Sequence, residues 1–399
     1  MDGYLVTGKE KDCVSCEGCI QICNHGAISM QENKYGFSYP KIDLNKCVEC
    51  GLCNLVCPME HKLVKHQTHK RSFGGYIKDE ATRNKSTSGG GFAAICRTFC
   101  DENYVIYGAV SEGINVFHKY ISDVSELEIF HSSKYAQSNM ANSFKEIKDH
   151  LRKGKKVVFS GTPCQVAGLY RYLINVEQKN LLTIEVLCTG IPSRLFIKKY
   201  DEWCCDKYGA RIKEFNYRYT GKNKWDDQST YTELENGKRI ITDRWFSRFF
   251  SIFLQRLMSR PACNECRFVT EERVADITLS DLWGVDREYP ELYDNGAGSS
   301  WIICNSDKGY EILLKAESQL IGHDVDFEKM KKYQRPGLIQ KTVHPRYDEF
   351  MEDLLTMNYI QLCKKWYKRP SIQLLFQKKV WNNRNRVRIW KLMNGMRKK

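Results

Sequence analysis

The sequence predicts an α+β protein in three parts: a small cysteine-rich module at the N-terminus, a mixed α/β domain, and a basic helical tail at the C-terminus. Eight cysteines at a repeated spacing fall within the first 58 residues, and buried-strand patterns alternate with helical ones along the middle of the chain. The 399 residues, 42% hydrophobic and 28% charged, suffice for two or three globular domains. We expect the module at 1–65, a connector at 66–85, the α/β domain at 86–345 and the tail at 346–399.

The eight N-terminal cysteines form two copies of one pattern, C-x2-C-x2-C-x3-C, and Pro58 follows the last of them. Three thiolates on a loop this tight can occupy three corners of a [4Fe-4S] cubane, while the fourth cysteine reaches the other cluster. Zinc is the alternative, although zinc sites usually combine two CxxC pairs set further apart. The pattern therefore predicts a bacterial-ferredoxin-like module that carries electrons. The expected ligands are Cys13, Cys16, Cys19 and Cys57 for one cluster, and Cys47, Cys50, Cys53 and Cys23 for the other.

Three stretches lead from the cysteine pattern into the α/β domain. The spacer between the two cysteine runs is expected to hold short strands at 27–30 and 37–40, with Gly36 at the turn. Residues 61–85 are polar and basic, so we predict a connector that runs over the surface. Residues 86–91, STSGGG, then precede an apolar helix. Such a helix start can bind a phosphate or another anion, and a plain glycine-rich helix start is equally compatible.

Strands that end at small polar turns predict the ligand-binding edge of the α/β domain. Residues 104–110, 157–160 and 181–187 have the composition of buried strands, and 161–165 turn the second of them into a helix. Ligands usually bind at the carboxyl ends of the strands in such sheets. A third cluster at this edge, or buried cysteines beside an incidental CxxC, are both compatible with the spacing. The cysteines concerned are Cys164, Cys188, Cys263 and Cys266.

The other elements are predicted from periodicity alone. Residues 142–153 form a helical pattern that ends at Gly154, and 276–284 and 301–304 have strand patterns. Helices are expected over 308–320 and from Tyr347 into the tail, and a hairpin insertion over 215–243.

Composition and charge exclude several classes of protein. No run of eighteen apolar residues and no secretory signal pattern occurs, so we expect a cytoplasmic protein whose eighteen cysteines stay reduced. From Leu354 to Lys399 there are 13 basic residues and no acid, whereas the first 353 residues hold 49 basic and 48 acidic side chains. A near-neutral body argues against nucleic acid as a partner. The tail is expected either to make a peripheral contact with the inner face of the membrane or to pack its Trp side chains on the body.

Six short motifs, taken together, narrow the prediction. They resemble the coenzyme F420 hydrogenase/dehydrogenase beta-subunit family, in versions with an N-terminal two-cluster ferredoxin module, and the resemblance spans about residues 1–320. The motifs, in family order, are STSGGGF (86–92), SSKYAQS (132–138), GTPCQVAGL (161–169), CTGIPS (188–193), CNEC (263–266) and ADITLSDLWG (275–284).

The resemblance implies a flavoprotein, with FAD bound in the α/β domain beside a [4Fe-4S] cluster. It implies that Cys164, Cys188, Cys263 and Cys266 hold this third cluster. It further implies FAD contacts for Ser88, Gly89 and Gly90, and positions near the flavin for Lys134 and Thr162. Asp281 and Trp283 are candidates for the pocket wall, with a packed Trp and a turn-capping Asp as the structural alternative. No catalytic acid or base is identified.

The combined prediction is an iron–sulfur flavoprotein oxidoreductase, a reductase or dehydrogenase. Electrons would pass from the two ferredoxin clusters through the third cluster to FAD, and on to a small organic substrate or a deazaflavin-like coenzyme. The alternative is a non-catalytic electron-transfer subunit that serves a partner oxidoreductase. Expected partners are a redox protein such as a ferredoxin or a hydrogenase/dehydrogenase subunit, and a homo-oligomer is compatible with the sequence.

Overall fold

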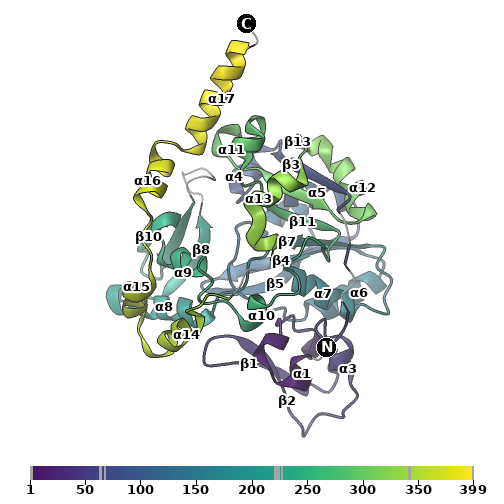
Figure 1. Ribbon diagram of the computed structural model, residues 1–399. Coiled ribbons are helices and arrows are strands. Elements are labelled where there is room, and N and C mark those ends of the chain that lie inside the picture. Colours follow the sequence, from purple (N-terminus) through teal and green to yellow (C-terminus); the bar gives the residue numbers. More distant parts are fainter. Residues whose placement is uncertain are drawn as a thin grey trace.

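A mixed sheet of eight strands, in the order β13-β3-β12-β11-β7-β6-β4-β5, forms the centre of the computed structural model (Figure 1). The structure describes residues 3–62, 65–66, 69–219, 225, 228–339 and 343–397. The neighbours β4, β6, β7 and β11 run parallel, so their carboxyl ends meet at one edge of the sheet. The strands are β3 (Arg71–Ile77), β4 (Tyr104–Glu112), β5 (Asn115–Ile121), β6 (Lys156–Gly161), β7 (Leu181–Val186), β11 (Ile277–Asp281), β12 (Ser300–Cys304) and β13 (Leu320–Asp324).

Helices cover both faces of this sheet. Val105 and Tyr107 of β4 pack in one core with α6 and α7, whereas Ile106 between them packs in another core with α5 and α12. This alternation is the period of two expected of a strand that is buried on both faces. The helices are α6 (Ser143–Arg152) and α7 (Pro163–Tyr172) on one face, and α5 (Gly91–Phe99) and α12 (Asp307–Ala316) on the other.

A second lobe surrounds a three-stranded antiparallel sheet in the order β10-β9-β8. The predicted hairpin at 215–243 is therefore three strands, and its residues 220–224 and 226–227 lie outside the described part of the chain. The core of the lobe is rich in aromatic side chains, among them Phe215, Phe249 and Phe350. Its elements are α8 (Arg194–Tyr208), β8 (Ile212–Tyr219), β9 (Ser229–Leu234), β10 (Arg239–Asp243), α9 (Arg248–Phe253), α14 (Tyr347–Thr356) and α15 (Tyr359–Trp366).

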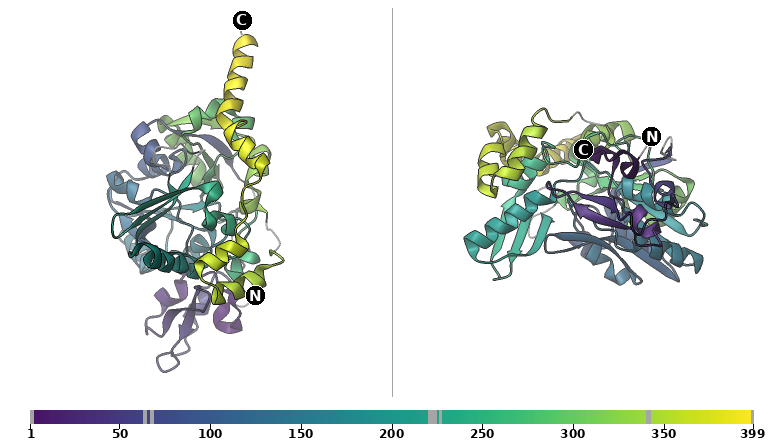
Figure 2. Two further views of the ribbon diagram at one scale, coloured as in Figure 1. Left: turned by 90° about the vertical axis from the view of Figure 1, so that its left-hand side faces the viewer. Right: turned by 90° about the horizontal axis from the view of Figure 1, so that it is seen from below.

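The C-terminal tail begins later than the predicted boundary at 346. Leu354, Leu362 and Trp366 of α14 and α15 are buried in the second lobe, so this part of the chain belongs to the body. The count of charges does not reveal this packing, because in α15 the exposed Lys364 and Lys365 stand between the buried Leu362 and Trp366. The helices α16 (Ile372–Lys379) and α17 (Asn383–Arg397) lie at the edge of the body, and α17 projects from it (Figures 1 and 2). No helix within the described ranges is both long enough and apolar enough to cross a bilayer.

The predicted surface connector at 66–85 is also wrong in part, because residues 71–77 form β3 inside the large sheet. Gly74 and Gly75 explain why no apolar strand pattern is visible there. A Cβ on Gly75 would lie 2.5 Å from the Ile321 carbonyl oxygen, so a bare backbone is needed beside β13. The helix predicted over 308–320 ends at Ala316, and β13 follows it. The short helix α4 (Glu80–Lys85) joins β3 to the glycine-rich stretch.

The N-terminal module lies at the end of the molecule opposite α17 (Figure 2). Its two strands, β1 (Ile28–Glu32) and β2 (Ser38–Ile42), pair antiparallel close to the predicted positions. Gly36 in the turn has a φ of +79°, which glycine adopts without strain. The short helix α1 (Tyr4–Thr7) precedes the first cysteine run, and α2 (Gly18–Ile22) and α3 (Leu52–Leu55) each lie within one of the two runs.

Candidate redox site

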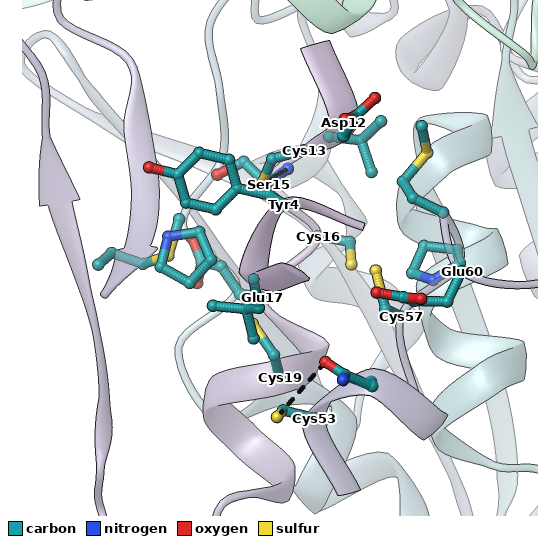
Figure 3. Close-up of a pocket in the computed structure, with 17 residues that line it drawn as sticks. Tyr4, Asp12, Cys13, Ser15, Cys16, Glu17, Cys19, Cys53, Cys57 and Glu60 are labelled. Atoms are coloured by element: carbon teal, nitrogen blue, oxygen red, sulfur yellow. Dashed lines mark hydrogen bonds between the residues drawn. The ribbon is translucent and has the colours of Figure 1, made fainter. Parts of the chain in front are cut away.

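Five cysteines of the N-terminal module line one small cavity, and four of them are the predicted ligands of one cluster. We call Cys13, Cys16, Cys19 and Cys57 the inner set. Figure 3 shows the sulfurs of Cys16 and Cys57 pointing toward one another. Burial raises the pKa of Cys16 well above its ordinary value, and the other three thiols raise it further. The Ser15 amide donates to Cys13 Sγ at 3.3 Å. Enclosed thiols that share a cavity and receive amide hydrogen bonds fit a [4Fe-4S] cluster, which would bind them as thiolates.

The other four cysteines of the module, the outer set, are Cys47, Cys50, Cys53 and Cys23. Cys50 is exposed, and the rest are half-buried. Burial raises the pKa of Cys53, and nearby Cys47 and Cys50 add to this rise, so these three thiols are neighbours. Cys53 also lines the inner cavity, and its thiol contributes to the raised pKa of Cys19. Cys53 therefore lies between the two sets. Cys23 follows α2 directly, and its place in the outer set stays a prediction.

Four further cysteines converge from three separate parts of the α/β domain. We call Cys164, Cys188, Cys263 and Cys266 the proximal set. Cys164 is in the first turn of α7, Cys188 follows β7, and the CxxC pair belongs to the region of α10 (Pro261–Asn264). Burial raises the pKa of Cys188 to about 12, and Cys263 and Cys266 contribute to the rise. The other three thiols likewise raise the pKa of Cys164. Such mutual effects require proximity, so the two strand ends and the CxxC motif meet at one place.

Donors and positive charges surround the proximal set. The Gly190 amide and the Arg273 guanidinium both lower the pKa of Cys188 against the effect of burial. Thr162 Oγ1 lies 3.1 Å from Cys164 Sγ. Groups of this kind stabilise thiolates and tune the clusters they bind. Throughout the described ranges, no three His, Cys, Asp or Glu side chains are close enough to hold a single metal ion.

The inner set packs against the helix that carries Cys164. A Cβ on Gly168 of α7 would lie 2.8 Å from Cys16 Cβ and 2.9 Å from Cys16 Sγ. Gly168 follows Cys164 by four residues, a rise of about 6 Å along the helix. Arg260, which directly precedes α10, is buried and donates from Nε to the Cys13 carbonyl at 2.8 Å. The inner and proximal sets are therefore held close together by packed, regular elements.

A cavity of about 340 Å³ adjoins the proximal set at the carboxyl edge of the sheet. Cys188 and Thr162 lie in its wall. α5 begins at Gly91, also in the wall, and the Gly91 amide donates to Ser300 Oγ at 3.3 Å. The next amides, of Phe92 and Ala93, lack partners within the helix, as the first amides of a helix do, so they can bind an anion. Of the residues expected near a flavin, those that line the cavity are Ser88, Gly90, Lys134, Thr162 and Asp281.

Gly89 and Trp283, the other two residues expected near a flavin, do not line this cavity. A Cβ on Gly89 would lie 2.5 Å from the Ser300 amide nitrogen, so this glycine permits packing on β12 and not contact with a ligand. Trp283 stacks on Trp225, with ring centroids 4.4 Å apart. A packed side chain is therefore the better description of Trp283.

Arg218 is a cavity residue that the sequence did not indicate. It is buried on β8 and forms a two-point ion pair with Asp281, Nη1 to Oδ2 at 2.8 Å and Nη2 to Oδ1 at 3.1 Å. Trp225 Nε1 donates to the same carboxylate at 2.9 Å. The pair joins the second lobe to the large sheet and fixes that side of the wall. Nothing in the local sequence NYRY marks Arg218, because only the docking of the lobe brings it to Asp281.

Three polar side chains in the wall, Lys134, His118 and His131, have unusual surroundings. Burial lowers the pKa of Lys134 to about 7, and its Nζ donates to the carbonyls of Phe130 and His131 at 3.0 and 2.7 Å. Burial also lowers the pKa of His118 to about 4, and its Nδ1 lies 2.7 Å from Ser138 Oγ. Both ring nitrogens of His131 are buried without a hydrogen-bond partner in the described structure. These nitrogens and the amides at the start of α5 fit a polar, phosphate-bearing ligand such as FAD.

Both the N-terminal module and the α/β domain match known protein families. Residues 154–326 match the family described as the C terminus of the coenzyme F420 hydrogenase/dehydrogenase beta subunit, and residues 12–61 match the 4Fe-4S dicluster domain. The predicted family resemblance is confirmed. The F420 hydrogenase/dehydrogenase match includes the whole proximal set, and the dicluster match includes all eight cysteines of the module. The module is therefore an iron–sulfur domain.

Among solved structures, the chain is similar to a chain of the xenon-derivatised F420-reducing [NiFe] hydrogenase complex from Methanosarcina barkeri. The identity is 16%, the match covers 76% of this chain and 92% of that chain, and the TM-score is 0.44. A likeness this low carries no argument about fold or function. No curated protein matches the chain.

Proposed function

We propose that this protein is an iron–sulfur flavoprotein oxidoreductase, in which electrons pass from the outer to the inner set, through the proximal set, and to FAD in the 340 Å³ cavity. One observation carries the proposal: the proximal set adjoins the cavity, whose wall contains Cys188. A cluster held there would lie directly beside the ligand of the cavity. The acceptor would be a small organic molecule or a deazaflavin-like coenzyme, in keeping with the family description.

The order of the three sets is argued from their burial. Cys50 of the outer set faces solvent, where a redox protein can approach. Cys16 of the inner set touches Gly168, one turn along α7 from Cys164. The proximal set then borders the cavity through Cys188. Each set therefore has the next one as its neighbour, as a relay requires.

Bound FAD would accept single electrons and transfer a pair as hydride, which an iron–sulfur cluster alone does not do. The residues of the chain have separate tasks around it. The first amides of α5, with Ser88, would bind the phosphates. The compensated Arg218–Asp281 pair gives a rigid wall without a net charge. Lys134 Nζ, with a pKa of about 7, can hold or release a proton beside the ligand at neutral pH.

The second candidate is a non-catalytic carrier that relays electrons to a partner oxidoreductase. The family description, which names a beta subunit, favours it, because a subunit implies a partner such as a hydrogenase or dehydrogenase subunit. A ferredoxin that docks at the exposed Cys50 would serve either candidate.

Anaerobic purification followed by iron, sulfide and flavin quantitation on the same sample separates the two candidates. We expect about twelve irons and one FAD per chain. About eight irons without flavin would overturn the enzyme proposal and leave the carrier.

A pair of cysteine substitutions locates the third cluster. Cys266→Ser should lose about four irons and keep about eight, because the proximal set loses one ligand. Cys205→Ser is the matched control, since this half-exposed cysteine on α8 belongs to none of the three sets. Equal iron content in both variants would contradict a cluster at the proximal set.

A further inference from the structure

We propose that α16 and α17 bind the surface of an anionic lipid bilayer. This inference does not depend on the redox chemistry proposed above. It rests on an exposed apolar surface, on the charges that surround it, and on the way these helices are fixed to the body.

The apolar surface begins on α16. Ile372, Phe376 and Val380 recur at helical spacing, and all three are exposed, Ile372 to 87%. Trp381 follows in the link to α17 and is also exposed. An exposed apolar stripe of this kind on a helix is unusual for a surface in contact only with water.

The same arrangement continues on α17. Ile389, Leu392 and Met393 follow the i, i+3, i+4 spacing of one helix face, and Leu392 is 62% exposed. Arg388 and Lys391 are exposed on the adjoining face. A helix that presents Leu, Ile and Met beside Lys and Arg can insert its apolar side chains at the lipid boundary while its cations contact anionic headgroups.

The attachment of α17 to the body leaves this surface free. Val387 is buried in the core beside Val285 of α11 (Val285–Glu288), and Arg386 Nε donates to Asp286 at 2.8 Å. Val387 lies on a different face from Ile389, Leu392 and Met393. Arg386 lies one turn before Ile389 on the same side of the helix, close to the start of α17, and beyond it Ile389, Leu392 and Met393 are 41%, 62% and 53% exposed. Lys378 pairs with Asp243 and fixes α16 in the same way. Figures 1 and 2 show α17 projecting from the body at the end opposite the N-terminal module, so a bilayer on α17 would leave that module accessible.

The charge of the tail distinguishes the three partners that the apolar surface of α16 and α17 could bind: a second copy of the chain, nucleic acid or an anionic bilayer. A second copy of the chain would bring two strongly basic segments together, because residues 354–399 hold 13 basic residues and no acid. Nucleic acid would satisfy the charges but leave the apolar side chains in water. An anionic bilayer satisfies both, and each Lys or Arg near its surface adds to the attraction.

Vesicle sedimentation with the full-length holoprotein tests the proposal. The probes are vesicles of phosphatidylcholine alone and of phosphatidylcholine with one part in three phosphatidylglycerol. We expect binding only to the anionic vesicles, with release at 0.5 M salt. Arg388→Gln with Lys391→Gln should weaken binding by about 25-fold, at about fivefold per charge. Ile389→Ser with Leu392→Ser should weaken it by about tenfold or more.

Matched control variants replace exposed basic and apolar side chains on the body instead of the tail. Lys153→Gln with Lys315→Gln, and Ile174→Ser with Leu314→Ser, replace exposed side chains elsewhere and should bind as the native chain does. Unchanged iron content would show that every variant is folded. The proposal is overturned if neither vesicle binds, if both bind equally, or if the tail variants behave like the controls. It is also overturned if the tail variants abolish a concentration-dependent self-association, measured by sedimentation velocity, and leave vesicle binding unchanged. The same holds if they abolish binding of an acidic polypeptide such as polyglutamate and leave vesicle binding unchanged.

Discussion

The two halves of the N-terminal module share one cysteine spacing and differ in their surroundings. Cys16 is buried against α7, whereas its counterpart Cys50 is exposed. Leu44 and Val48, beside the second cysteine run, are 80% and 58% exposed. The same ligand pattern therefore serves an interior position in one half and a surface position in the other. The cysteines provide the cluster ligands in both halves, and the residues between them determine whether those ligands are buried or exposed.

Glu17 and Gly51 show how this difference arises. They occupy equivalent places, two residues before the third cysteine of each run, and both are left-handed, with φ of +62° and +71°. Glycine adopts this conformation freely, whereas a residue with a Cβ loses about 1 kcal/mol. The buried Glu17 carboxylate accepts the Met140 amide at 2.9 Å. Glu17 thus combines local strain with a buried contact to the α/β domain, whereas the strained non-glycine residue of the second half, Glu49 with a φ of +53°, is exposed.

The largest expected difference between the halves concerns loss of a cluster. Cys16→Ser and Cys50→Ser should each lose about four irons. Cys16→Ser should also lower the melting temperature of the α/β domain, because the inner set packs on α7, while Cys50→Ser should leave it unchanged. Iron analysis and calorimetry measure both effects. If the two variants destabilise the α/β domain equally, the distinction between an inner and an outer cluster is wrong.

Arg260 should account for the next largest effect. Its Nε and Nη2 donate to the carbonyls of Cys13 and Ser38 at 2.8 and 2.9 Å in a buried setting. Arg260→Gln would leave buried acceptors without donors, which should lower the free energy of unfolding by about 3 kcal/mol. Lys46→Gln in the second half is the control, because its ion pair with Asp43 is exposed and worth less than about 1 kcal/mol. Urea unfolding of both variants measures the difference, and equal losses would contradict it.

A smaller loss of stability is expected when Glu17 or Gly51 is replaced by alanine. Gly51→Ala introduces a Cβ at a left-handed residue and should destabilise the protein by about 1 kcal/mol. Glu17→Ala keeps the strain and removes the acceptor of the Met140 amide, so it should cost about 1 to 3 kcal/mol. Glu17→Gly should recover the part of the free energy of unfolding that the left-handed conformation of residue 17 costs a side chain with a Cβ. The idea fails if Glu17→Gly is no more stable than Glu17→Ala in the same unfolding measurement.

Much of the fold could be predicted because local patterns determined it. β4, β6 and β7 have the composition of buried strands, and the residues that follow parallel strands come together at one edge of the sheet. For this reason Cys164 and Cys188, far apart in the sequence, could be expected at one place. The cysteine spacing of the module needed no long-range information.

The parts that were missed depend on contacts between distant segments. Arg218 lies in a lobe whose docking on the large sheet no local pattern reveals, so its pairing with Asp281 could not be foreseen. β3 was missed because Gly74 and Gly75 fit against β12 and β13 only through tertiary packing. The burial of α14 and α15 was missed because charge was counted over a segment whose apolar residues pack on the second lobe.

The smallest expected effect concerns the exposed surface of the second half. Leu44 and Val48 flank Cys47 and would be covered by a redox protein that docks at the outer set. Interfaces of transient redox partners are small, so Leu44→Ser with Val48→Ser should raise KM for a reduced ferredoxin by about threefold to tenfold. Iron content and the free energy of unfolding should stay the same, since neither side chain is buried. Ile174→Ser, an exposed substitution on the body, is the control and should leave KM unchanged. An unchanged KM in the double variant would mean that the partner docks elsewhere, and the exposure of the outer set would then need another explanation.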